Sequence, residues 1–342
     1  LALVVPFLPG VAALPADARA VAGVATLTAW CWLTAALPLP VASLLPAFLL
    51  PATGAIPARQ VAPWYFHDIL LLFLGGFILA IGLERYGLHR RFALRALTLF
   101  GAAPRRVVLG FMLVAALLSM FVSNTSTALL MLPVALAVLD RCAPADREIL
   151  TRPLLLGIAY ACSIGGVATP IGTAPNSVFL GQIRDRFPDA PSIAFGSWFL
   201  GALPLVAGFL AVAWFVLVRV VHRVPGSSGL SIEEVRQERQ ATGRRSAEQN
   251  RVLAIFLLVA SLWMTRSGAD FGAVSLPGWQ ELLPQQVAAT ISDSTVALLG
   301  VVLLFLLPGR SPRTGALLDW EDCKQVPWGI LILLGGGFAL AR

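Results

Sequence analysis

Long apolar blocks are the feature that most limits what this chain can fold into. The stretches Leu154–Leu180 and Phe199–Val221 match the ~20 apolar residues that an α-helix needs to cross a bilayer. The chain is 58% hydrophobic and only 13% charged, whereas roughly a quarter of the residues of a soluble domain are charged. We therefore expect an all-α polytopic membrane protein, placed as a multi-pass protein in a bacterial inner membrane.

The distribution of arginine predicts which loops face the cytoplasm. Arginines cluster in Glu84–Arg106 and in Arg219–Arg251, between apolar blocks, and cytoplasmic loops are enriched in Lys and Arg. Ser267–Ser292 contains neither residue type and suits the opposite face. The net charge of +7 is thus explained by loop orientation, and we expect the lipid bilayer, not nucleic acid, as the partner.

Eight apolar segments fit between these loops as predicted spans. They are Val21–Leu37, Pro40–Pro57, Asp68–Leu83, Pro153–Leu180, Trp198–Val221, Val252–Arg266, Ser294–Pro308 and Trp328–Ala341.

One further apolar stretch, Val107–Leu139, is too long for a single untilted crossing and is interrupted by the polar run Ser123–Thr127. A re-entrant hairpin over residues of about 107–140 keeps Asp140–Arg152 on the cytoplasmic side, whereas a single crossing inverts every later loop. Backbone that is not helical at membrane depth is tolerated where it is buried in protein or lines a wet cavity. The hairpin tip is therefore a candidate site. The alternative is a straight helix with a kink.

A short internal repeat predicts two copies of opposite orientation. The segment Leu74–Ala80 recurs as Gly335–Ala341, and the loop charges give the two copies opposite directions, as in inverted-topology transporters. We expect a first repeat over 1–222 that begins with a helix remnant, a cytoplasmic linker over 223–251, and a second repeat over 252–342. The second repeat is incomplete, because the chain stops before a second hairpin.

The second polar interruption, Ser163–Ser177, lies in the predicted span Pro153–Leu180 and contains glycines, an asparagine and two prolines. Such residues do not continue a helix. The helix over about 153–181 must unwind here, which frees carbonyl oxygens that suit a hard cation such as sodium, and the resuming half-helix offers its N-terminus to an anion. Neither interruption contains Asp, Glu, Lys or Arg, which argues against a proton relay.

The two interruptions together resemble the signature of the divalent anion:sodium symporter family. They read Ser-Asn-Thr at 123–125 and Thr-Pro-Ile-Gly-Thr-Ala-Pro-Asn at 169–176. The resemblance implies a homodimer with an elevator-type mechanism and no cofactor besides the coupling ion. It implies sodium ligands at Ser119, Ser123, Asn124 and Gly172, substrate contacts at Asn124, Thr125 and Thr173, and loop-shaping residues at Thr169, Pro170, Pro175 and Asn176.

The resulting hypothesis is sodium-coupled symport of a small divalent anion, such as the C4-dicarboxylates succinate or malate. The alternatives are a dicarboxylate or citrate exchanger of the same fold, or a sulfate symporter. A sodium/proton antiporter or metalloid efflux protein is more distant, because we would expect it to carry an intramembrane acid. An enzyme is not expected, because no His/Asp/Glu cluster lies at membrane depth.

Overall fold

The structure is a computed structural model that describes residues 13–100, 103–140, 142, 144–187, 189, 193–225, 240, 242–270, 275–311 and 313–341. The predicted helix remnant at the start of the chain lies outside these residues. Helices account for most of the described chain, which divides into two compact units. The first unit comprises Leu1–Leu74, Val178–Ala190 and Lys324–Arg342, and the second comprises Gly75–Ser177 and Pro191–Cys323.

The described part of the first unit is built from two longer helices and several short ones. Its elements are α2 (Ala16–Thr34), α3 (Leu39–Ala42), α4 (Leu45–Ala52), α5 (Ala58–Val61), the 3₁₀ helix η2 (Ala62–Phe66) and α17 (Trp328–Ala341). Glycines allow α17 to approach its neighbours closely, because a Cβ on Gly336 would lie 2.5 Å from the carbonyl oxygen of Ser43. Ser43 also accepts hydrogen bonds from Trp32 Nε1, at 3.0 Å, and from the Tyr65 hydroxyl, at 2.6 Å.

The predicted span Pro40–Pro57 is not one continuous helix. It comprises α3, α4 and a turn that precedes α5. Pro46 has no N–H to donate to the carbonyl four residues earlier, so the chain breaks before it and α4 begins there with proline in its first turn.

The second unit contains most of the long helices. They are α7 (Leu88–Phe100), α8 (Pro104–Ser119), α9 (Asn124–Leu139), α10 (Pro144–Gly166), α12 (Phe195–Phe215) with its π-helical continuation η3 (Val216–Val221), α14 (Ala247–Thr265) and α16 (Asp293–Leu306). The helices α6 (Asp68–Arg85) and α11 (Ala174–Arg186) contribute residues to both units.

Shorter elements complete the second unit. The strands β1 (Ala269–Asp270) and β2 (Ser275–Leu276) pair antiparallel, with Ala269 opposite Leu276. The remaining elements are η4 (Trp279–Leu282), α15 (Gln285–Ala288) and η5 (Trp320–Gln325), the last of which crosses into the first unit.

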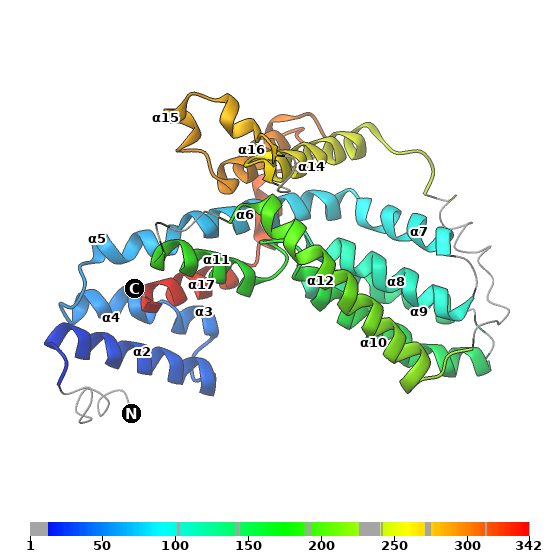
Figure 1. Ribbon diagram of the computed structural model, residues 1–342, viewed down its shortest axis with the longest axis horizontal. Coiled ribbons are helices and arrows are strands. Elements are labelled where there is room, and N and C mark those ends of the chain that lie inside the picture. Colours follow the sequence, from blue (N-terminus) through cyan, green and yellow to red (C-terminus); the bar gives the residue numbers. More distant parts are fainter. Residues whose placement is uncertain are drawn as a thin grey trace. The chain divides into compact units, whose positions relative to one another are not determined.

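Helices α8, α9, α10 and α12 lie side by side and enclose the main core of the second unit (Figure 1). Phe111 and Met112 of α8 pack in this core with Met131 of α9 and Leu154 of α10. A Cβ on Gly165 would lie 2.3 Å from the carbonyl oxygen of Ala116, so α8 and α10 pack through their backbones. The polar run separates α8 from α9, and these two helices contact each other.

A buried ion pair joins three helix ends in the second unit. Arg266 Nε, after α14, donates to Asp293 Oδ1 at 2.6 Å, and the two side chains are only 11% and 14% exposed. The other carboxylate oxygen of Asp293 accepts a hydrogen bond from the backbone N–H of Phe195 at 3.1 Å. The start of α16 is therefore tied to the end of α14 and to the start of α12.

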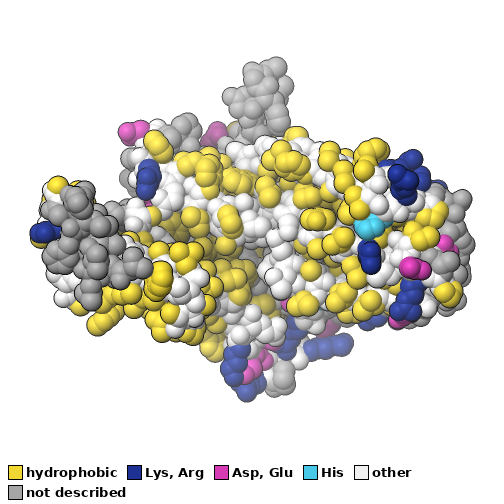
Figure 2. Space-filling view, turned by 90° about the horizontal axis from the view of Figure 1, so that it is seen from below, with side chains coloured by type: hydrophobic (Ala, Val, Ile, Leu, Met, Phe, Trp, Pro, Cys, Tyr) yellow, Lys and Arg dark blue, Asp and Glu magenta, His cyan; other side chains and the backbone are white. Residues whose placement is uncertain are grey.

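Several helices present apolar side chains where a soluble protein would present polar ones. Within the described residues, three helical stretches are long and apolar enough to cross a membrane: Ala58–Arg85, Asp146–Gly166 and Phe195–Val221. In the last of these, Phe209, Val212 and Phe215 are each more than half exposed. Apolar side chains also cover much of the face shown in Figure 2. Such surfaces suit contact with lipid, and the prediction of a helical multi-pass membrane protein is confirmed.

Candidate functional site

The polar run forms the turn between α8 and α9 and the first turn of α9. Ser123 is the N-cap of α9, and its hydroxyl oxygen accepts a hydrogen bond from the backbone N–H of Ser126 at 3.2 Å. The same hydroxyl donates to the Ser126 hydroxyl at 2.9 Å. A serine at this position satisfies one of the backbone N–H groups that a helix start leaves unpaired. Asn124 is consequently the first residue of α9.

Ser119 and Asn124 face each other across this turn. Ser119 ends α8 and is fully buried, and its hydroxyl donates to Asn124 Oδ1 at 2.5 Å. Two oxygens that the family resemblance assigns to sodium are therefore adjacent before any ion is bound.

The second interruption separates α10 from α11. Helix α10 ends at Gly166, turns follow, and α11 begins at Ala174, so the predicted unwinding is present. The buried Asn176 amide donates to two carbonyl oxygens of this unwound loop, Gly166 O at 2.9 Å and Thr169 O at 2.8 Å. The Ser177 hydroxyl donates to Pro170 O at 2.6 Å. Side chains of α11 thus hold the shape of the loop that precedes it.

Thr169 ties the unwound loop to the hairpin tip. Its buried hydroxyl donates to the carbonyl oxygen of Met120 in the α8–α9 turn and accepts a hydrogen bond from the backbone N–H of Gly172 at 3.0 Å. Pro175 lies in the first turn of α11, where the absence of an N–H costs no helical hydrogen bond. The predicted loop-shaping residues are therefore all at or beside the break.

The two interruptions meet at Gly166. A Cβ placed on Gly166 would lie 2.7 Å from Asn124 Oδ1, 2.6 Å from Thr173 Cγ2 and 3.2 Å from the carbonyl oxygen of Gly172. Three of the predicted site residues, Asn124, Gly172 and Thr173, therefore pack against Gly166 so closely that a side chain would not fit there. Sequence reasoning placed Gly166 in the interruption but missed its role, because a close approach between segments 40 residues apart leaves no local pattern.

Two hydroxyls near this point are not part of the hydrogen-bonded cluster. The Thr125 side chain is exposed, and within the described residues no hydrogen bond of it is found. Thr127 is 1% exposed, and its hydroxyl has no hydrogen-bond partner within the described part of the chain. Buried polar atoms are normally paired, so Thr127, one turn after Asn124, is a further candidate that the polar run contained.

The donor set at this point is neutral. Hydroxyl, amide and carbonyl oxygens gather beside Gly166, and among the described residues no group of three His, Cys, Asp or Glu side chains gathers anywhere to hold a metal ion. Neutral oxygens suit a hard monovalent cation better than zinc or a redox metal, which favour nitrogen and sulfur.

Comparisons of the sequence with known proteins identify the family of this chain. A family model described as citrate transporter (CitMHS) matches residues 27–342. Sodium-dependent dicarboxylate transporters SdcS of Staphylococcus aureus, from the strains NCTC 8325 and COL, are 36% identical to the chain over 336 residues. The alignment covers 93% of this chain and 61% of each relative, so the chain spans about three fifths of the length of the curated relatives it matches. The predicted relationship to sodium-coupled divalent anion carriers is confirmed, and the chain belongs to the citrate transporter family.

Proposed function

We propose that the protein is a secondary active transporter that couples uptake of a small divalent anion, a C4-dicarboxylate such as succinate or malate, to sodium. The observation that carries the proposal is the meeting of Asn124, Gly172 and Thr173 around Gly166. The names of the relatives support the choice of sodium and dicarboxylate, and the description of the family keeps citrate as the nearest alternative.

In the proposed sodium site, Asn124 Oδ1 and the Gly172 carbonyl oxygen bind the ion together with the Ser119 hydroxyl. Ser119 now donates its proton to Asn124 Oδ1. When the hydroxyl hydrogen rotates away, both oxygens are free to face one cation. Ser123 serves first as the N-cap of α9, and its hydroxyl retains a lone pair for the same ion.

The anion would bind where two helices begin. Helix α9 starts at Asn124 and α11 starts next to Thr173, and both residues pack against Gly166. Helix N-termini carry a partial positive charge and unpaired N–H groups. With the Asn124 amide, the Thr173 and Thr125 hydroxyls and the charge of the bound sodium, they supply donors for a carboxylate without a buried Lys or Arg.

Family resemblance and the loop charges support the larger features of the proposal. These are a re-entrant hairpin formed by α8 and α9, inverted repeats that pair α6 with α17, a homodimer and elevator-type movement. The likeness between Leu74–Ala80 and Gly335–Ala341 is the sequence support for the repeats.

The test is uptake of radiolabelled succinate into proteoliposomes that contain the protein made from its complete gene. Uptake should require an inward sodium gradient and should be lost in Asn124→Ala and reduced in Ser119→Ala. Ser163→Ala is the matched control, because the exposed Ser163 hydroxyl bonds only to a carbonyl of its own helix, α10. Uptake driven by internal dicarboxylate without sodium would instead indicate exchange, and sodium-driven uptake of sulfate or citrate in place of succinate would change the substrate.

A further inference from the structure

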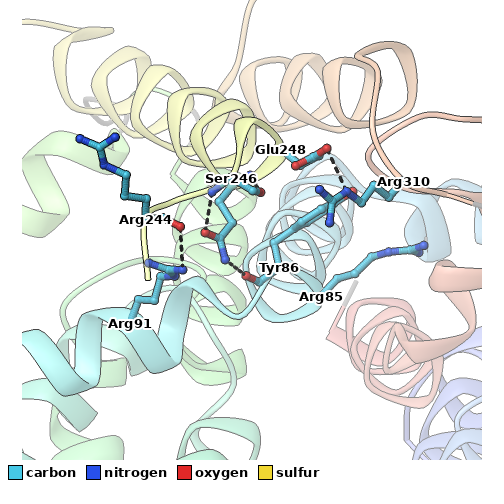
Figure 3. A pocket seen from close by; sticks show the side chains of 8 residues that line it. Arg85, Tyr86, Arg91, Arg244, Ser246, Glu248 and Arg310 are labelled. Atoms are coloured by element: carbon cyan, nitrogen blue, oxygen red, sulfur yellow. Dashed lines mark hydrogen bonds and ion pairs between the residues drawn. The ribbon is translucent and has the colours of Figure 1, made fainter. Parts of the chain in front are cut away.

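A basic cavity of about 380 Å³ lies in the second unit, apart from the proposed transport site (Figure 3). Its lining comes from the end of α6, the start of α7, the residues before and in the first turn of α14, and the segment after α16. The charged lining residues are Arg85, Arg91, Arg244, Glu248 and Arg310.

Positive charge in this cavity exceeds the negative charge available to neutralise it. Arg310 Nε donates to Glu248 Oε1 at 3.1 Å. Arg85 is paired with Asp322, which is not in the lining. The four guanidinium groups therefore exceed the two carboxylates by two charges.

The remaining two arginines have no carboxylate partner in the described part of the chain. Arg91 donates to the backbone carbonyl oxygens of Thr242, Gly243 and Arg244, at 2.8 Å for Gly243. These contacts fix the guanidinium but bring no formal negative charge. The Arg244 side chain is exposed and extends away from Arg91 in Figure 3.

Tyr86, Ser246 and Gln249 form the floor of the cavity between the arginines, and hydrogen bonds within the protein hold them in place. Gln249 Oε1 accepts a hydrogen bond from the Ser246 N–H at 3.1 Å, and Gln249 Nε2 donates to Tyr86 O at 2.8 Å. In Figure 3, Arg91 and Arg244 lie on one side of this floor and Arg85 and Arg310 on the other. An anion resting on the floor would thus lie between Arg91 and Arg310, and the exposed Arg244 side chain, which points outward in Figure 3, would turn inward to reach it.

The position along α14 places this cavity near the head groups of a bilayer. The apolar part of α14 begins at Val252, one turn after Gln249, and the flanking segments Glu84–Arg106 and Arg219–Arg251 are those predicted to face the cytoplasm. Basic pockets at this level of membrane proteins suit lipid phosphates.

We propose that this cavity binds a phosphate group, supplied by the head of an anionic lipid or by a soluble phosphate ester. Arginine matches phosphate oxygens with two parallel N–H donors, and the volume falls at the lower end of the ~300–1,000 Å³ usual for small-ligand pockets. The bound group would bridge the ends of α6, α14 and α16 on the cytoplasmic side. This inference does not depend on the identity of the transported anion.

The test is thermal unfolding of the purified full-length protein during titration with phosphatidylglycerol, with glycerol 3-phosphate, and with phosphatidylcholine as the neutral lipid. Phosphatidylglycerol should raise the unfolding temperature, and Arg244→Gln combined with Arg310→Gln should weaken its apparent affinity at least about tenfold, because the variant loses two charged donors to the phosphate oxygens. Equal stabilisation by glycerol 3-phosphate would identify the soluble ester as the source.

Arg313→Gln is the matched control. Arg313 lies in the same loop as Arg310, is similarly exposed and pairs with a glutamate, Glu321, at the same 3.1 Å, but does not line the cavity. Its affinity for phosphatidylglycerol should equal that of the unmodified protein. Unchanged affinity in Arg244→Gln with Arg310→Gln, an equal loss in Arg313→Gln, or equal stabilisation by phosphatidylcholine would overturn the proposal.

Discussion

Gly166→Ala should damage sodium binding while leaving the fold in place. The new methyl group would lie 2.7 Å from Asn124 Oδ1 and 2.6 Å from Thr173 Cγ2, whereas ordinary contact begins at 3.4 Å. The asparagine oxygen must therefore move by roughly 0.7 Å or the loop must shift. Overpacking of this kind costs about 1–3 kcal/mol, and about 1.4 kcal/mol corresponds to a tenfold change in affinity.

The assay is the sodium concentration that gives half-maximal succinate uptake in proteoliposomes. We expect it to rise between about fivefold and a hundredfold in Gly166→Ala, because the displaced oxygens are the proposed sodium ligands. Gly208→Ala is the control, since no atom lies within 4 Å of its Cβ position in α12. Gly165→Ala distinguishes an effect on the site from an effect on folding. Its Cβ would meet the Ala116 backbone, so this variant should reduce the amount of folded protein. Normal sodium dependence in a well-folded Gly166→Ala protein would refute the reasoning.

Three further predictions concern stability and are read from thermal unfolding in detergent. Asn176→Ala removes the side-chain donor from Gly166 O and Thr169 O, and Thr169 O keeps only a 3.3 Å hydrogen bond from the Gly172 N–H. The free energy of unfolding should fall by about 1–3 kcal/mol, and an unchanged unfolding temperature would contradict the assigned role. Asp293→Ala leaves the buried guanidinium of Arg266 without its carboxylate and should lower the free energy of unfolding by about 3–5 kcal/mol. Asp140→Ala breaks an exposed ion pair and should lower it by at most about 1 kcal/mol. The Ser311 hydroxyl lowers the pKa of Asp319. The hydrogen bond between them therefore stabilises the folded protein fully above the ordinary pKa of about 3.9, and this stabilisation is lost as the pH falls through the lowered pKa. The difference in unfolding temperature between Ser311→Ala and the unmodified protein should therefore shrink in acid. A difference that stays constant with pH would show that the hydrogen bond to Ser311 does not depend on the charge of Asp319.

The sequence predicted the breaks in the helices better than their lengths. Proline, glycine and Ser-Asn-Thr runs act locally, so the turn after α8 and the unwound loop after α10 follow from them directly. The predicted span Pro40–Pro57 is divided into separate helices, because Pro46 has no N–H to continue α3. Apolar composition alone does not show such a break.

Features formed by distant segments were not predictable in this way. The cavity combines Arg85, Arg244 and Arg310, and only the folded chain brings these loops together. Likewise, the close approach at Gly166 depends on how α8 and α9 pack against α10. A glycine in an already glycine-rich loop gives no sign of which neighbour requires it.

The hydrogen bonds at the site provide a reason for sodium and the anion to bind cooperatively. Asn176 holds the loop carbonyls whether or not an ion is present, whereas Asn124 Oδ1 is occupied by the Ser119 proton. In the proposed mechanism, sodium at this oxygen would turn that proton away and add a positive charge beside the starts of α9 and α11, so that a carboxylate there would bind more tightly. Coupling between two ligands is reciprocal. Succinate should therefore increase sodium affinity by the same factor as sodium increases succinate affinity, and Ser119→Ala, which removes the competing proton together with one ligand, should change both factors equally.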